Sequence, residues 1–189
     1  MLIVVRHGRT ARNAQGRLLG RDDPPLDDEG ERQAARLGGV LRPDRVVSSP
    51  LERARRTAEA FGLPVEVDER WIELDYGAME GTPTAEVPRE TWAEWRADVC
   101  YRPAGGESLV ELSARVGAAC DDLIDEATRR DVVVVTHVSP VKAAVSWALG
   151  VGCEVAWRTF VAPASITRIA VGPWGPSLHA FNETAHLTD

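Results

Sequence analysis

Residues that can carry out chemistry follow three short apolar stretches of the chain. Arg6 and His7 come directly after the apolar run at residues 2–5, His137 follows the run VVVVT, and Arg53 lies one turn into the segment after RVVSS. Imidazole can act as a nucleophile or a base, and the planar guanidinium of Arg fits phosphate oxygens through two hydrogen bonds. Brought together, these side chains would form a site for a phosphoryl group.

The apolar stretches read as buried strands that could bring these residues together. A short, continuously apolar run is typical of a central parallel strand covered on both faces, and we expect such strands at residues 2–5, 45–48 and 131–137, with a weaker one at 65–67. In open α/β sheets, ligands bind beyond the carboxyl ends of the strands. If the strands are neighbours, His7 and His137 meet at one edge.

The segments between these strands predict helices. One helix begins near Asp27 as its N-cap, and another begins with Ser49 as N-cap, Pro50 at the first helical position and Glu52 completing a capping box. A short helix flanked by loops is expected within 77–106, and a longer one over 109–128.

A further helix follows the strand at 131–137, with Ser139 as cap and Pro140 as first helical residue, and it ends at Gly150. The last third of the chain alternates between apolar and polar residues, which predicts two edge strands joined by a Gly/Pro turn. We therefore expect a three-layer α/β fold with a mostly parallel central sheet flanked by helices. Residues 1–189 would form one domain, with a segment near 77–108 that caps the substrate.

Composition narrows the classes of function. The chain has 189 residues and a formal net charge of −7 at pH 7, and a nucleic-acid partner would require a basic face. Cys100, Cys120 and Cys153 are few, odd in number and widely spaced, so we expect interior thiols in a reducing cytoplasm. No segment has the roughly 20 apolar residues of a membrane span, and no signal peptide is evident, so we expect no membrane partner.

Several sequence blocks resemble the histidine phosphatases, the superfamily that includes phosphoglycerate mutase. The first is RHGRTARN at residues 6–13, and the others, in order along the chain, are G…DPPL…G at 20–30, SSPLERA…TA at 48–58, ELDYG…EG at 73–81, P.GGES at 103–108 and TH at 136–137. Because these blocks span almost the whole chain in the order of the family, the resemblance is more specific than an R-H-G tripeptide alone.

The resemblance implies a phosphoglycerate mutase-like fold and a role for each matching residue. His7 would be the nucleophile that becomes a phosphohistidine, and Glu73 would be the proton donor and acceptor. The residues expected to hold the phosphoryl group or the substrate are Arg6, Arg53, His137, Asn13, Gly8 and Thr10.

General chemistry is consistent with these roles. An imidazole with the ordinary pKa of about 6.5 is largely neutral at pH 7 and can attack phosphorus without a metal or another cofactor. A carboxyl group whose pKa is raised by burial and a nearby phosphate can protonate the leaving group and later take a proton from water. Glu73 is preferred for this task, and Glu80 is the rival.

One departure from the family pattern concerns the residue after the second histidine. Many members have glycine there, whereas this chain has Val138, which could narrow the approach to the phosphate. The run HVSPVK resembles a branch of actinobacterial acid phosphatase-like domains, as does the tail NETAHL. The P.GGES block resembles the phosphatase branch that includes α-ribazole-phosphate phosphatases.

Three functions stay open at this point. The favoured one is hydrolysis of small phosphomonoesters. Phosphoglycerate mutase chemistry is the second, although the segment at 82–101 is short and offers few cations to hold a second phosphate. A non-catalytic phosphate-binding module is the third.

The aromatic residues and the assembly state also stay open. Trp92 and Trp95 could form a stacking platform for the substrate, or they could pack into the core. The C-terminal edge strands could pair between subunits and give a homodimer.

Overall fold

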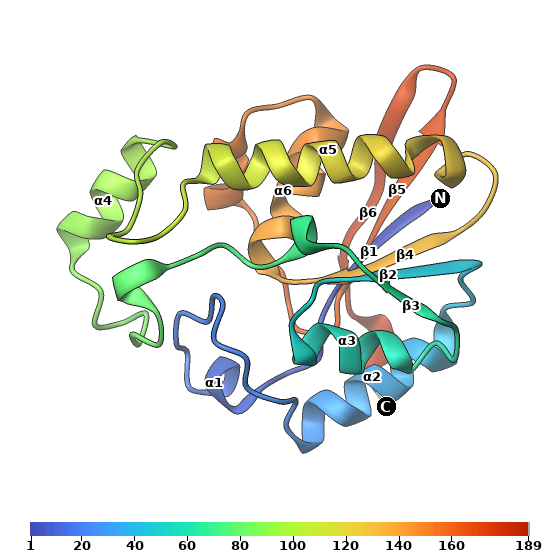
Figure 1. Ribbon diagram of the computed structural model, residues 1–189, viewed down its shortest axis with the longest axis horizontal. Coiled ribbons are helices and arrows are strands. Elements are labelled where there is room, and N and C mark those ends of the chain that lie inside the picture. The colour runs from blue at the N-terminus through green and yellow to red at the C-terminus, as the bar shows by residue number, and fades with distance from the viewer. Residues whose placement is uncertain (189) are drawn as a thin grey trace.

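The computed structural model describes residues 1–188 of the chain (Figure 1). Its strands are β1 (Leu2–Arg6), β2 (Arg45–Ser48), β3 (Val65–Val67), β4 (Val132–Thr136), β5 (Ile166–Gly172) and β6 (Gly175–Glu183). Its α-helices are α1 (Ala11–Ala14), α2 (Asp28–Val40), α3 (Glu52–Glu59), α4 (Arg89–Ala97), α5 (Leu109–Ala127) and α6 (Val138–Leu149). Four 3₁₀ turns complete it: η1 (Glu69–Trp71), η2 (Gly77–Met79), η3 (Cys153–Arg158) and η4 (Ala185–Leu187).

The six strands form one sheet in the order β3-β2-β4-β1-β5-β6. The pairs β3–β2, β2–β4 and β4–β1 are parallel, and the pairs β1–β5 and β5–β6 are antiparallel. The expected mostly parallel sheet is thus confirmed. The expectation of two C-terminal edge strands is wrong for β5, which lies between β1 and β6 and uses both of its sides.

Helices cover both faces of this sheet, which explains why β1 and β4 are apolar up to their last residues, Arg6 and Thr136. Leu2 and Val4 pack in one buried cluster with residues of α5 and α6, whereas Ile3 and Val5 pack in a second cluster with residues of α2 and α3. Figure 1 shows the same arrangement, with α5 and α6 on one side of the strands and α2 and α3 on the other. The fold therefore has the three layers expected from the sequence.

The helix starts were predicted with mixed success. Asp27 caps α2 as expected, since its side chain accepts a hydrogen bond from Gly30 N at 2.8 Å. The expected capping box at Ser49 is wrong, because α3 begins only at Glu52 and its N-cap residue makes no side-chain hydrogen bond. Instead, the N–H of Glu52 donates to the side chain of Asp23 at 2.8 Å. The cap comes from a distant loop, which no local pattern could reveal.

The start of α6 also differs from the prediction. The helix begins at Val138 with His137 as its N-cap residue, so that Ser139 and Pro140 already lie within the first turn. The predicted end is confirmed, because Gly150 adopts the left-handed conformation with φ of 63° that glycine tolerates best.

The segment at 77–108 contains the expected short helix, α4, which lies to one side of the sheet at the left of Figure 1. Cys100 in this segment is exposed, which corrects the expectation that all three cysteines are interior, whereas Cys120 is buried and Cys153 is half-buried. Within residues 1–188, none of the helices combines the length and the apolar character needed to cross a membrane.

Candidate active site

The sheet brings His7 and His137 together at the carboxyl ends of β1 and β4. These parallel strands pair residue by residue up to Arg6 and Thr136, and the N–H of His7 continues the ladder by donating to Thr136 O at 2.8 Å. The centroids of the two imidazole rings lie 5.0 Å apart with an interplanar angle of 61°. The predicted meeting of residues that are 130 positions apart is therefore confirmed.

His7 is held in one tautomer, with the lone pair on Nε2. Its side chain is buried, and Nδ1 lies 2.6 Å from Gly8 O, so Nδ1 carries the proton and donates it to that carbonyl. Nε2 is left as an acceptor, and Arg53 Nε donates to it at 3.3 Å. Burial and then the nearby guanidiniums of Arg53 and Arg6 lower the pKa of His7 well below 6.5. The imidazole is thus more firmly neutral than the ordinary value implies, as a nucleophile requires.

Arg53 on α3 joins the nucleophile to the loop before α2. Its side chain is fully buried, and besides contacting His7 it donates to Asp22 O and Gly20 O at 2.6 Å each. Glu80 fixes the same loop from the other side, because its carboxylate accepts from the N–H groups of Gly20 and Arg21 at 2.7 and 3.1 Å. These bonds give Glu80, the rival candidate for the proton donor, a structural role in holding the loop.

Two buried polar atoms near His7 have no partner among the described residues, and they belong to Arg6 and His137. Arg6 donates through Nη1 to Val161 O at 2.7 Å, but its Nε is unpaired. His137 shares a hydrogen bond of 2.7 Å with Ser49 Oγ through Nε2, but its Nδ1 is unpaired. Because buried polar atoms are nearly always paired, these two atoms mark where oxygens of a ligand would bind.

The charge of this site favours an anion. Burial lowers the pKa of Arg6 to about 10, so its guanidinium remains charged at neutral pH. Burial, together with Arg53 and His7, lowers the pKa of His137 well below 6.5. Within residues 1–188 no group of three or more His, Cys, Asp or Glu side chains is arranged to hold a metal ion. The guanidiniums of Arg53 and Arg6 are the cations that lower the pKa of His7.

Glu73 is the carboxylate of the site. It is only 2% exposed, and its Oε1 accepts from Leu74 N at 2.7 Å and from Ser139 N at 3.1 Å. Burial raises the pKa of Glu73, and the two N–H donors and Arg53 oppose that rise only in part. A carboxyl group with a raised pKa can hold a proton near neutral pH and give it to a leaving group.

Sequence reasoning missed Arg115, which supports the backbone that carries Glu73. From α5, Arg115 Nη1 donates to Arg70 O at 2.6 Å and to Ile72 O at 2.7 Å, and Nη2 donates to Glu73 O at 3.2 Å. The same guanidinium forms an ion pair with Glu107 at 2.7 Å. An arginine in a helix usually faces solvent, so nothing local in the sequence distinguishes this one.

Gly8, Thr10 and Asn13 shape the loop after His7. A Cβ atom on Gly8 would lie 2.5 Å from Gly30 O, so only glycine fits there, and its N–H is already used by Thr57 Oγ1 at 3.0 Å. Thr10 and Asn13 form a reciprocal capping box at the start of α1. This bonding explains the residue types without a ligand, and a substrate-binding role for the three residues stays a prediction.

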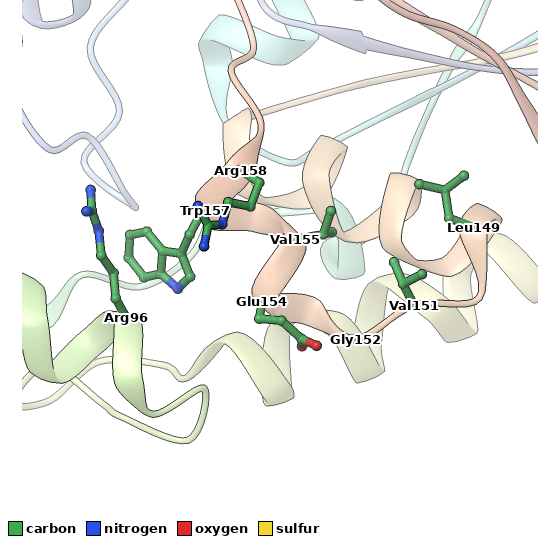
Figure 2. A pocket seen from close by; sticks show the side chains of 8 residues that line it. All are labelled: Arg96, Leu149, Val151, Gly152, Glu154, Val155, Trp157 and Arg158. Carbon is green, nitrogen blue, oxygen red and sulfur yellow. The ribbon is translucent and has the colours of Figure 1, made fainter.

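Two hollows flank the aromatic part of the 77–108 segment. The smaller, with a volume of about 170 Å³, is lined by Trp92, Trp95, Val138 and Ser139 among others, and so lies beside Glu73. Trp95 also belongs to the buried core, so its packing role and its place on the cavity wall coexist. The larger hollow, of about 520 Å³, is shown in Figure 2. Neither hollow is lined by the phosphate-site residues themselves, but the smaller one is lined by Leu74 and Val138, which adjoin Glu73 and His137 in the chain.

The sequence-family model that describes the histidine phosphatase superfamily (branch 1) matches residues 2–184 of this chain. The chain belongs to that superfamily. The expectation drawn from the sequence blocks is thereby confirmed. The matched part includes all the residues that form the site described above.

Two curated relatives illustrate the range of the family. The chain is 36% identical over 201 residues to the "Bifunctional protein Rv2228c" of Mycobacterium tuberculosis, which covers 98% of this chain but 54% of that protein. It is 30% identical over 203 residues to the "Probable phosphoglycerate mutase GpmB" of Yersinia enterocolitica, covering 98% of this chain and 94% of that protein. The chain thus spans about half the length of the mycobacterial relative.

Solved structures of phosphatases share the fold. Phosphoserine phosphatase of Entamoeba histolytica, in complex with 3-phosphoglyceric acid, superposes with a TM-score of 0.92 at 26% identity and covers 99% of this chain and 98% of that one. Mycobacterial glucosyl-3-phosphoglycerate phosphatase Rv2419c, in complex with VO₃, gives a TM-score of 0.87 at 30% identity, with coverages of 97% and 98%. The expected phosphoglycerate mutase-like fold is confirmed, and the chain is similar to phosphatases.

Proposed function

We propose that this chain hydrolyses small phosphomonoesters, without a metal, through a phosphohistidine on His7. The observation that carries the proposal is the surroundings of His7: its neutral imidazole has a fixed tautomer, its Nε2 contacts Arg53, and its ring lies 5.0 Å from that of His137. The neighbouring residue Arg6 and His137 each keep a buried polar atom without a partner among the described residues. Phosphoryl transfer needs positioning and charge stabilisation more than covalent chemistry from the protein. The site offers both.

In the first step, Nε2 of His7 attacks phosphorus and the bond from phosphorus to the leaving oxygen breaks. Arg6, Arg53 and His137 bind the phosphoryl oxygens, and protonated Glu73 gives its proton to the leaving alkoxide, which departs as an alcohol. In the second step, water attacks the phosphohistidine and loses a proton to the Glu73 carboxylate. The N–P bond breaks, inorganic phosphate leaves, and His7 and Glu73 return to their starting states.

The alternative is the mutase reaction, in which the phosphohistidine returns its phosphoryl group to a second substrate. The relative from Yersinia enterocolitica carries that name. Two cations of the capping region are already engaged, because Arg102 forms an ion pair with Glu111 at 2.7 Å and Arg96 lies over the ring of Trp157. Their engagement favours transfer to water. Interconversion of 2- and 3-phosphoglycerate without release of phosphate would support the mutase reaction.

The direct test replaces the nucleophile. We expect His7→Ala to lower turnover of 4-nitrophenyl phosphate by at least about 10³-fold in the presence of a chelator. The matched control is His179→Ala, which removes an exposed histidine on β6 and should leave turnover unchanged. A phosphoenzyme that is labile in acid and stable in base should form with His179→Ala and not with His7→Ala. Undiminished turnover in His7→Ala would overturn the proposal, and absence of turnover in the unmodified chain would favour the non-catalytic module.

A further inference from the structure

The smaller cavity borders the residues that hold the Glu73 carboxylate. Leu74 and Ser139 line this cavity, and the backbone N–H groups of the same two residues donate to the carboxylate of Glu73. The proposed proton donor therefore stands at the boundary between the cavity and the phosphate site. The walls of the cavity then select the alcohol part of the substrate.

Aromatic rings form most of one wall. Trp92 and Trp95 stack in parallel with an interplanar angle of 10° and centroids 5.7 Å apart, and Trp157 meets both edge-on. Tyr76 packs against Trp95 at 77°. Such pairs fix one another's orientation. On its other side, Trp157 is covered by the guanidinium of Arg96, 5.6 Å from the ring centroid, as Figure 2 shows. The wall is thus formed before any ligand binds.

A single ammonium group stands at this cavity. Lys142, on α6, lines it and is the only lysine of the chain, which otherwise carries 21 arginines. Its Nζ donates to Ala156 O at 2.8 Å, and no carboxylate among residues 1–188 forms an ion pair with it. An ammonium has three donors. Burial lowers the pKa of Lys142, and the nearby Glu73 opposes that shift. The ammonium therefore keeps hydrogen-bond donors for a ligand, and a ligand carboxylate would favour its charged form.

Two further donors belong to the cavity wall. The indole Nε1 atoms of Trp95 and Trp157 are buried, and neither has a hydrogen-bond partner in the described part of the chain. Buried donors without a partner are uncommon. Together with Lys142, these residues give the cavity lining several hydrogen-bond donors, beside the hydroxyl groups of Tyr76 and Ser139. The matching ligand group accepts hydrogen bonds and carries negative charge.

The cavity is open on one side, so its volume describes the group that fits inside it and not the whole ligand. At about 170 Å³, it is close to the engineered cavity of about 150 Å³ that binds one benzene molecule. A sugar of similar size would bring several hydroxyl groups against the aromatic wall, and burying an unpaired hydroxyl is unfavourable. The cavity therefore suits one ring or an apolar group of that size.

We propose that the substrate is a phosphomonoester whose leaving group is a single aromatic ring bearing a carboxylate, which Lys142 binds. This inference rests on the proposed phosphatase function and adds the class of alcohol that the site selects. The ring lies along the Trp92, Trp95 and Trp157 wall, and the carboxylate accepts from Lys142 at the polar part of the cavity.

The kinetic test compares two aryl phosphates. We measure kcat/KM for 4-carboxyphenyl phosphate and for phenyl phosphate in the unmodified chain, in Lys142→Met, and in the control Arg129→Met, which removes an exposed cation at the end of α5. A hydrogen bond to a charged group corresponds to about 10- to 100-fold in rate, so Lys142→Met should lower the ratio of the two kcat/KM values by that factor. Because the ratio is compared between variants, the different acidities of the two phenols cancel. Arg129→Met should keep the ratio.

A binding test keeps this inference separate from the catalytic proposal. 4-Hydroxybenzoate, the product alcohol, should quench tryptophan fluorescence of the unmodified chain, and about tenfold more of it should be needed with Lys142→Met. Quenching without any turnover would overturn the phosphatase function and leave the cavity assignment standing. Turnover with the same ratio in Lys142→Met, or no quenching, would overturn the cavity assignment.

If Lys142→Met does not fold, as judged by circular dichroism, Trp92→Leu provides the second variant. It removes a half-buried ring of the wall and should lower kcat/KM for both aryl phosphates while glucose 6-phosphate, which gains nothing from the wall, is unaffected. Equal losses on all three substrates would also overturn the inference.

Discussion

Arg115 provides the strictest test of how the proton donor is positioned. Replacing it by methionine keeps much of the apolar stem and removes the guanidinium that binds three backbone carbonyls and Glu107. Breaking a buried ion pair costs about 3–5 kcal/mol, and hydrogen bonds to charged groups contribute about 1.5–3 kcal/mol each. These contributions share one side chain and both charged partners keep some exposure, so we expect the free energy of unfolding to fall by about 3 kcal/mol.

The effect on catalysis should depend on the leaving group. A displaced Glu73 protonates an alkoxide poorly, so kcat for glycerol 2-phosphate should fall by about 10- to 100-fold in Arg115→Met. For 4-nitrophenyl phosphate, whose phenolate leaves without a proton, the fall should be less than about threefold. Urea denaturation gives the stability, and steady-state rates on the two substrates, at a temperature where the variant is folded, give the ratio.

The control removes a different arginine, which lies outside α5 and forms an ion pair with a residue of that helix. Arg102→Met breaks an exposed ion pair with Glu111 on α5 and should cost less than about 1 kcal/mol without changing the ratio of the two rates. If Arg115→Met loses stability while the ratio stays constant, Arg115 supports the fold but does not position the acid. If stability is also unchanged, the energetic reasoning itself is wrong.

Two further predictions concern protonation and packing. Burial raises the pKa of Glu73, and the protonated carboxyl group is the proposed donor, so kcat should decline as the pH rises through that pKa. Glu73→Gln should lower kcat by about 10²- to 10⁴-fold and should abolish the decline of kcat at alkaline pH. A pH–kcat profile of both proteins measures this. A decline that persists in Glu73→Gln assigns the titration to another group. A Cβ on Gly30 would collide with Arg9 O, whereas one on Gly39 in the same helix would meet nothing within 4 Å. Thermal or urea unfolding should therefore show Gly30→Ala strongly destabilised and Gly39→Ala stabilised by up to about 1 kcal/mol; equal effects at the two positions would contradict the packing argument.

The parts of the fold that follow from local sequence were predictable. The runs at 2–5 and 132–136 are buried on both faces, so their apolar character and the polar residues that end them identified both the strands and the edge where His7 and His137 meet. The cap at Asp27 was also readable, because its partner lies three residues away.

The parts that depend on distant contacts were not predictable. Ser49 has the residue type of an N-cap, yet its hydroxyl is hydrogen-bonded to His137, and the helix start is held by Asp23 instead. The roles assigned to Arg115 and Lys142 depend on contacts with residues more than ten positions away in the chain. The residue types at these positions are ordinary, and only the tertiary contacts distinguish them.

Because β1 pairs residue by residue with β4, the proposed activity can arise only late in the synthesis and folding of the chain. Neither imidazole has its counterpart until both strands have aligned, and they stand at opposite ends of most of the sequence. Under the proposed mechanism, we therefore expect no turnover from a nascent polypeptide until residue 137 has left the ribosome and β4 has inserted between β1 and β2. The rate at which turnover recovers during refolding should consequently report the rate at which β4 pairs with β1 and β2.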